Sequence, residues 1–175
     1  MIGLGNLRYF IEVEISKKRA EHLVKSTPEP EALAAELWDF ILLNEHPISW
    51  RANWFLEHLG AENREFVRPY LQSIVKAFPT FKFDGQRRSS MKILLMFPIT
   101  DYDYGRMVNY CFDLLLSHED AVAVRMFAML ILVEIVKLEP ELKGELKDTI
   151  EFILPNTQKG LQSICRRTLV KLDKM

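Results

Sequence analysis

Two tryptophans four residues apart are the most chemically distinctive feature of the sequence. Trp50 and Trp54 would share one face of a helix, beside Arg51 and His58. Tryptophan and arginine are the side chains that most often anchor a partner protein. The pattern therefore predicts an aromatic contact surface. The alternative is that both rings pack between neighbouring helices.

Arginines recur at a regular interval along the chain. Arg51, Arg88, Arg125 and Arg167 are separated by 37, 37 and 42 residues. If the chain is built from stacked units, equivalent positions align along one edge. One interpretation is that these guanidinium groups pair with carboxylates at the seams between units. The other is that they line a basic groove for an acidic partner or a phosphate backbone.

Three carboxylates stand at suitable places for such pairs, namely Glu45, Asp84 and Asp120. The register of two arginines is open, because Arg87 fits its expected helix better than Arg88 does, and Arg166 adjoins Arg167. The candidate binding residues are accordingly Trp50, Arg51, Trp54, His58, Arg87, Arg88, Arg125, Arg166 and Arg167.

Groups that could support catalysis or metal binding do not converge in the sequence. His118, Glu119 and Asp120 are adjacent in an expected turn, whereas a metal needs three or four converging ligands. Cys111 and Cys165 fall on apolar helical faces and are expected to be buried, unreactive thiols. We therefore predict no catalytic residues, no metal and no cofactor. This favours a protein that is not an enzyme, without excluding one.

Composition and charge restrict the classes of protein that fit. The chain has 175 residues, of which 49 % are hydrophobic, and a formal net charge of −1, as expected for one globular domain. Two cysteines exclude a disulfide framework. Neither a secretory signal nor a membrane span is expected, which favours the cytoplasm and argues against a membrane partner.

Basic charge gathers in two patches of the chain. Residues 84–97 carry a net charge of +2 and residues 158–175 a net charge of +4. A dedicated nucleic-acid-binding protein is normally basic overall. The balance therefore disfavours nucleic acid as the partner, although each patch alone could hold an acidic group.

Apolar periodicity punctuated by proline predicts helices along almost the whole chain. Pro69 predicts a late start or a bend in the third helix, and Gly60 is expected to take a left-handed cap position. Residues 7–13 alternate enough for a strand to be an alternative there. The expected helices cover residues 31–44, 49–59, 62–78, 86–97, 103–116, 119–138, 140–154 and 158–173, with one more around 15–25.

These helices fall into pairs whose ends recur every 35 to 38 residues, the period of an α-solenoid. A helix that is apolar nearly all round, as residues 119–138 are, is expected to be buried on most sides. The chain is thus predicted to be a single helical repeat domain, 1–175, with pairs at approximately 30–60, 61–98, 102–138 and 140–174.

The segment from His118 to Ala128 resembles the second helix of a HEAT or armadillo-type repeat. The matching positions are Asp120, Val124, Arg125, Ala128 and Leu132. The resemblance extends over about residues 30–174, with one good repeat and three weaker ones. It implies an all-α fold, a right-handed α-α superhelix of about four helix pairs with a further helix at the N-terminus.

The resemblance implies a non-enzymatic binding or scaffold module whose concave face holds another protein. A second hypothesis is a relative of the HEAT-like alkylpurine DNA glycosylases, or a nucleic-acid-binding protein, in which the tryptophans and arginines hold a nucleotide. A third is a helical protein that forms homo-oligomers through the open ends of its repeat stack.

Overall fold

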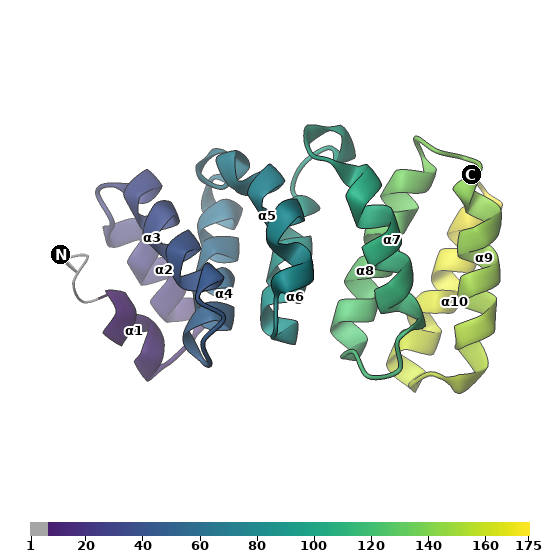
Figure 1. Ribbon diagram of the computed structural model, residues 1–175, viewed down its shortest axis with the longest axis horizontal. Coiled ribbons are helices and arrows are strands. Elements are labelled where there is room, and N and C mark those ends of the chain that lie inside the picture. Colours follow the sequence, from purple (N-terminus) through teal and green to yellow (C-terminus); the bar gives the residue numbers. More distant parts are fainter. Residues whose placement is uncertain (1–6) are drawn as a thin grey trace. The chain divides into compact units, whose positions relative to one another are not determined.

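The computed structural model describes residues 7–175, and regular structure within that range is helical throughout (Figure 1). The chain divides into two compact units, Met1–Pro98 and Ile99–Met175. The expected all-α class of a helical repeat protein is therefore confirmed for the described residues. Among them, no helix combines the length and apolar character that crossing a bilayer requires.

The first unit is arranged around α4, which packs against four other helices, α1, α2, α3 and α6. The predicted apolar face of α4 lies in the core, with Ala52, Phe55, Leu56 and Leu59 all buried. The helices of this unit are α1 (Leu7–Val13), α2 (Lys17–Ser26), α3 (Pro30–Leu42), α4 (Ile48–Glu62), α5 (Leu71–Ala77) and α6 (Asp84–Leu94).

Proline determines where α5 begins. Pro69 lies in a 3-10 turn, Arg68–Tyr70, and the α-helix starts only after it, at Leu71. The ring of proline supplies no N–H and fixes φ, so it suits a first turn and not a helix interior. The predicted late start is confirmed.

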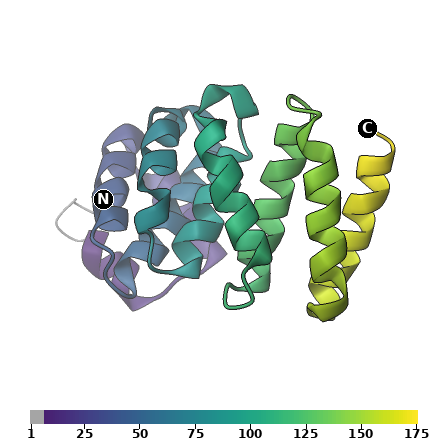
Figure 2. The ribbon, with the colours of Figure 1, turned by 45° about the vertical axis from the view of Figure 1, so that its right-hand side comes forward.

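The second unit contains four α-helices arranged as two neighbouring pairs (Figure 2). They are α7 (Tyr104–Leu116), α8 (Val122–Val136), α9 (Leu142–Ile153) and α10 (Lys159–Asp173). Helix α8 contacts all three others, and nine of its fifteen residues are buried. Its lack of a polar face thus reflects contacts on several sides, as predicted from its composition.

Two local predictions are wrong. Residues 7–13 form helix α1 and not a strand, because Leu7 and Ile11, four residues apart, are both buried. The leading segment consequently holds two helices in place of the one expected. Gly60 is not a left-handed cap, since it lies inside α4 and no described glycine has a positive φ.

The left-handed position falls at Asn44, with φ of 53°, in the turn between α3 and α4. Asparagine tolerates this conformation better than most residues. Gly60 is small for another reason. A Cβ atom at Gly60 would lie 2.7 Å from a methyl group of Val67, so the glycine permits a close approach of the chain that follows α4.

Candidate binding surface

A row of aromatic side chains runs along one face of α4. Trp50, Trp54 and His58 follow at four-residue steps, and each is partly exposed. The Trp54 and His58 rings lie 3.9 Å apart between centroids. Nδ1 of His58 donates to the main-chain oxygen of Trp54 at 2.8 Å. The three side chains therefore form a partly exposed row along α4, in which the Trp54 and His58 rings are tilted by 48° to one another.

Trp50 also packs against the start of α6. A Cβ atom on Gly85 would lie 2.9 Å from Cβ of Trp50 and 3.2 Å from its ring, so only glycine fits there without displacement. The His46 ring also lies near this tryptophan, 6.5 Å from the Trp50 ring. Trp50 thus combines both interpretations of the tryptophan pair, because it fills a helix–helix contact while part of the ring remains exposed.

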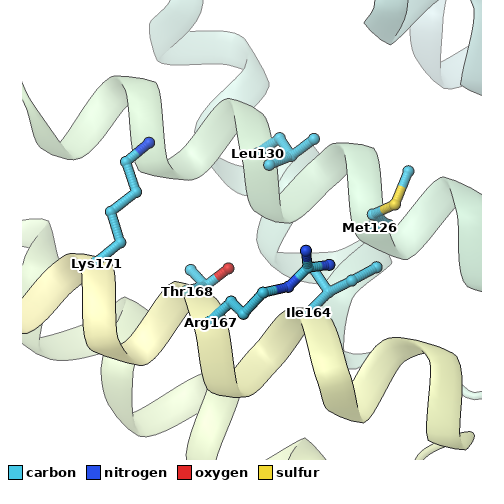
Figure 3. A pocket seen from close by; sticks show the side chains of 6 residues that line it. All are labelled: Met126, Leu130, Ile164, Arg167, Thr168 and Lys171. Atoms are coloured by element: carbon cyan, nitrogen blue, oxygen red, sulfur yellow. The ribbon is translucent and has the colours of Figure 1, made fainter.

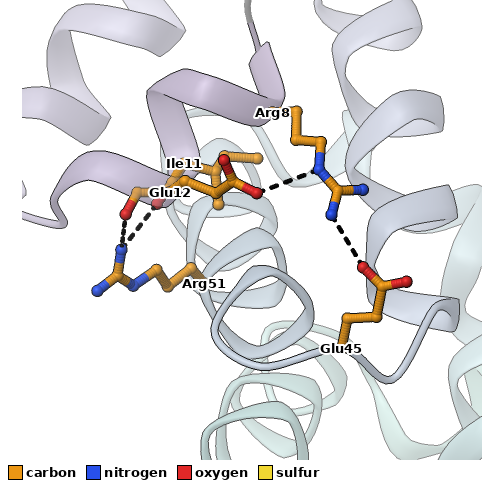
Figure 4. A network of polar contacts seen from close by, with 5 residues as sticks. All are labelled: Arg8, Ile11, Glu12, Glu45 and Arg51. Carbon is orange, nitrogen blue, oxygen red and sulfur yellow. Dashed lines mark hydrogen bonds and ion pairs between the residues drawn. The ribbon is translucent and has the colours of Figure 1, made fainter.

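Arg51 closes the C-terminal end of α1 (Figure 4). Its Nη1 donates to the main-chain oxygens of Ile11, at 3.1 Å, and of Glu12. These carbonyls have no acceptor role inside their own helix, so a cation there is favourable. Its guanidinium also lies 5.4 Å from the Trp50 ring. Arg51 therefore binds α1 to α4 beside the aromatic row.

The carboxylate expected to pair with such an arginine has another partner. The carboxylate of Glu45 accepts a hydrogen bond from Nη2 of Arg8 at 2.9 Å, and Nε of Arg8 donates to Glu12 at 3.1 Å (Figure 4). The prediction of an arginine–carboxylate pair is thus wrong for Arg51. The reason is that the end of α1 presents backbone carbonyls closer to this arginine.

Arg125 repeats the arrangement in the second unit. It occupies the fourth position of α8, as Arg51 does in α4, and it is only 4 % exposed. Nε and Nη2 donate to the main-chain oxygen of Leu115 at 3.2 and 3.0 Å, near the end of α7. Burial lowers the pKa of Arg125, an effect that the nearby Asp120 carboxylate opposes.

Arg125 therefore corrects two expectations. Its hydrogen bonds go to a backbone carbonyl and, at 3.4 Å, to the hydroxyl of Thr157, in place of a carboxylate. A buried guanidinium with these bonds does not present itself to a partner. We leave Arg125 out of the candidate surface.

The remaining arginines differ in their exposure and in the partners of their guanidinium groups. Arg87 lies 3.4 Å from Asp84 within the first turn of α6, so one predicted carboxylate does pair with an arginine. Arg88 is partly exposed, and Arg166 and Arg167 are exposed on α10. The guanidinium groups of these last three form no hydrogen bond or ion pair among residues 7–175. They are the candidate cations that a partner could reach.

Sequence reasoning missed a buried polar seam between α4 and α6. Asn53 donates from Nδ2 to the main-chain oxygen of Gln86 at 2.8 Å and to Oγ of Ser90 at 2.7 Å. Glu57, 5 % exposed, accepts from Ser89 at 2.8 Å. The available signal was the recurrence of polar residues at four-residue steps, Ser49, Asn53 and Glu57, inside a largely apolar helix.

The same carboxylate forms an ion pair with Lys92 of α6. Its two oxygens therefore have different partners, a hydroxyl and an ammonium group. Removing a charge from water is costly unless such partners are present. The seam thus fixes how α4 and α6 align.

The thiols and acidic clusters do not form a reactive centre within the described chain. Cys111 and Cys165 are buried, and burial raises the pKa of both thiols. Residues 7–175 contain no group of three histidine, cysteine, aspartate or glutamate side chains placed to hold a metal ion.

An open cavity of about 300 Å³ lies between α8 and α10 (Figure 3). Arg167, one of the candidate cations, is among the residues that line it. The six side chains that line it are Met126, Leu130, Ile164, Arg167, Thr168 and Lys171. Apart from Arg167, none of them was a candidate from the sequence, because the pairing of α8 with α10 is needed to bring them together.

Comparison with known proteins identifies one family. The pattern of the HEAT repeat domain matches residues 7–172, nearly the whole chain. No curated protein and no solved structure gave a match.

Proposed function

Because the chain belongs to the HEAT repeat domain family, we propose that it is a non-enzymatic binding module that holds another protein on α4 and α6. Repeats of this family commonly mediate protein interactions. The observation that carries the proposal is the partly exposed row of Trp50, Trp54 and His58 on α4. Such aromatic rings bury large area at small entropic cost, which makes them effective anchors.

Arg88, on the neighbouring helix α6, is the partly exposed arginine that we add to this row. It stands between Gly85, which contacts Trp50, and Lys92, which contacts Glu57, so it belongs to the stripe of α6 that lies along α4. Its guanidinium has no ion pair among the described residues. A protein with an apolar or aromatic side chain next to a carboxylate is the partner that this combination suits.

Site-specific photo-crosslinking tests the proposal. A benzoylphenylalanine at His58 places the reactive group at the end of the row, and one at Asn109, exposed on α7, serves as the control position. In an extract of the source cells, position 58 is expected to capture a defined protein that position 109 does not. Arg88→Glu should reduce that product, whereas Arg106→Glu, an exposed charge reversal elsewhere, should not.

Two results would contradict the proposal. One is a product of equal yield at both positions. The other is retention of the product in Trp54→Ala and Arg88→Glu proteins that circular dichroism shows to be folded. Gel-shift experiments with plain and alkylated DNA test the nucleotide alternative, and salt-sensitive binding of DNA would favour it instead. A crosslink between two copies of the chain would identify a homo-oligomer.

A further inference from the structure

The cavity between α8 and α10 combines an apolar floor with two cationic side chains (Figure 3). Met126 and Leu130 lie one turn apart on α8, and Ile164 faces them from α10. Arg167 and Lys171 extend from α10 toward α8 on either side of Thr168. The volume of about 300 Å³ falls at the lower end of the range for ligand pockets.

The positive charge at this cavity is poorly neutralised. Arg167 has no ion pair among residues 7–175, and the ammonium group of Lys171 is 3.8 Å from a Glu134 carboxylate that is itself paired with Lys137. The one acidic residue of the segment 158–175 is Asp173, and its carboxylate forms an ion pair with Lys147 at 2.6 Å. An incoming carboxylate would thus meet a free guanidinium.

We infer that this cavity binds an acidic segment of a partner protein. A bulky apolar side chain of the segment enters between Met126, Leu130 and Ile164. A neighbouring carboxylate pairs with Arg167, whose planar group can bind both oxygens, and a second reaches Lys171. The site is separate from the aromatic row of the first unit and goes beyond the function proposed for that row.

The apolar lining of the cavity favours an acidic protein over a nucleic acid as the occupant. Binding of single-stranded nucleic acid usually relies on aromatic side chains on which bases stack, and the six lining residues include no aromatic ring. Methionine, leucine and isoleucine instead favour an aliphatic or aromatic side chain, and burying it contributes affinity in proportion to area. The combination therefore selects a peptide that carries apolar and acidic groups together.

Fluorescence anisotropy with three labelled twelve-residue peptides tests the inference on the full chain. The first has a central Leu-Phe pair flanked by aspartate and glutamate. The second replaces Leu-Phe with Ser-Ser, and the third replaces every acid with lysine. The first is expected to bind about tenfold more tightly than either control, since each control removes one of the two interactions.

Matched variants locate the site. Arg167→Glu should weaken binding of the first peptide about tenfold or more, whereas Arg166→Glu, an identical charge change on the adjacent exposed residue, should change it less than about threefold. Leu130→Gln should also weaken binding, and Leu138→Gln, at a leucine 45 % exposed, should not. If Leu130→Gln fails to fold, Met126→Gln supplies the same test of the floor.

The inference is overturned if the full chain binds none of the peptides, or if Arg166→Glu and Arg167→Glu weaken binding equally. It is also overturned if a twelve-nucleotide oligothymidine binds more tightly than the first peptide. Trp54→Ala and Arg88→Glu should leave peptide binding unchanged. A loss in those two variants alone would place the peptide on the first unit and so distinguish this site from the one proposed above.

Discussion

The guanidinium of Arg125 donates from both Nε and Nη2 to the single main-chain oxygen of Leu115, so a buried charge closes the end of α7. Lysine cannot reproduce this fork. We expect Arg125→Lys to lower the free energy of unfolding by about 2 kcal/mol, the order of a buried hydrogen bond to a charged group. Urea unfolding followed by circular dichroism measures the change.

The control is Arg166→Lys, the same substitution at an exposed arginine of the same unit. It should alter stability by less than about 0.5 kcal/mol. Equal effects of the two substitutions would show that the bonds to Leu115 contribute nothing to folding.

A second prediction concerns the ion pair between Glu57 and Lys92. Glu57 is buried whereas the Lys92 side chain is 38 % exposed, so Lys92→Met leaves a carboxylate in the core with only Ser89 beside it. We expect a loss of about 2 kcal/mol, somewhat below the value for fully buried pairs. In the double variant Glu57→Leu/Lys92→Met the uncompensated charge is gone, and the protein should be more stable than Lys92→Met alone.

Urea unfolding of the wild type, both single variants and the double variant forms a double-mutant cycle. The cycle should give a coupling free energy of about 1 kcal/mol or more. Additive effects would mean that the two groups do not interact in solution.

A third prediction contrasts glycines by the space around them. A Cβ atom at Gly60 would meet Val67 at 2.7 Å, whereas one at Gly144, inside α9, would have nothing within 4 Å. Gly60→Ala should therefore lower stability by about 1–3 kcal/mol through overpacking. Gly144→Ala should raise it by about 0.5–1 kcal/mol, because alanine has less backbone entropy to lose in a helix.

Thermal unfolding measures both effects: Tm should fall in Gly60→Ala and rise in Gly144→Ala. Gly160→Ala provides a second control, since the space around Gly160 in α10 is also open. A Gly60→Ala variant as stable as the Gly144→Ala variant would contradict the close approach of Val67.

A fourth prediction concerns pH. Burial, followed by the charge of Asp39, raises the pKa of Glu36, and one of its oxygens is buried without a hydrogen-bond partner in the described chain. A raised carboxyl pKa means that folding favours the protonated form, so this group lowers stability as pH rises through its titration. Glu36→Gln should therefore be more stable than the wild type at pH 7.

The difference should disappear below about pH 4, where the wild-type carboxyl is protonated in both states. Tm measured from pH 3.5 to 8 tests this. Glu31→Gln, on the exposed first turn of the same helix, loses a favourable charge at a helix start and should not gain stability at pH 7. A pH-independent gain in Glu36→Gln would exclude titration as its cause.

The helices were predictable because apolar periodicity and proline act locally. The ring of Pro69 determined where α5 starts. The apolar face of α4 followed from the helical spacing of its apolar residues, of which Phe55, Leu56 and Leu59 are buried. Residues 7–13 were ambiguous because they fit both a helical and an alternating period, and tertiary contacts, including those with α4, decide for the helix.

The candidate surface was less predictable, because the partners of charged side chains depend on which helix ends meet. The spacing of Arg51 and Arg125 correctly indicated equivalent positions, but not that both would bind backbone carbonyls of an earlier helix. Likewise, Lys171 and Leu130 become neighbours only once α10 lies along α8.

The polar seam of the first unit also sets a condition on engineering. Asn53 and Glu57 depend on Ser90 and Lys92, residues that belong to the following pair of helices. A chain lengthened by duplicating residues 30–62 would place Asn53 and Glu57 against a copy without those partners. Each would then be buried at a cost of about 1–3 kcal/mol. The repeats of this unit are therefore not interchangeable modules, and their order is encoded in side-chain hydrogen bonds.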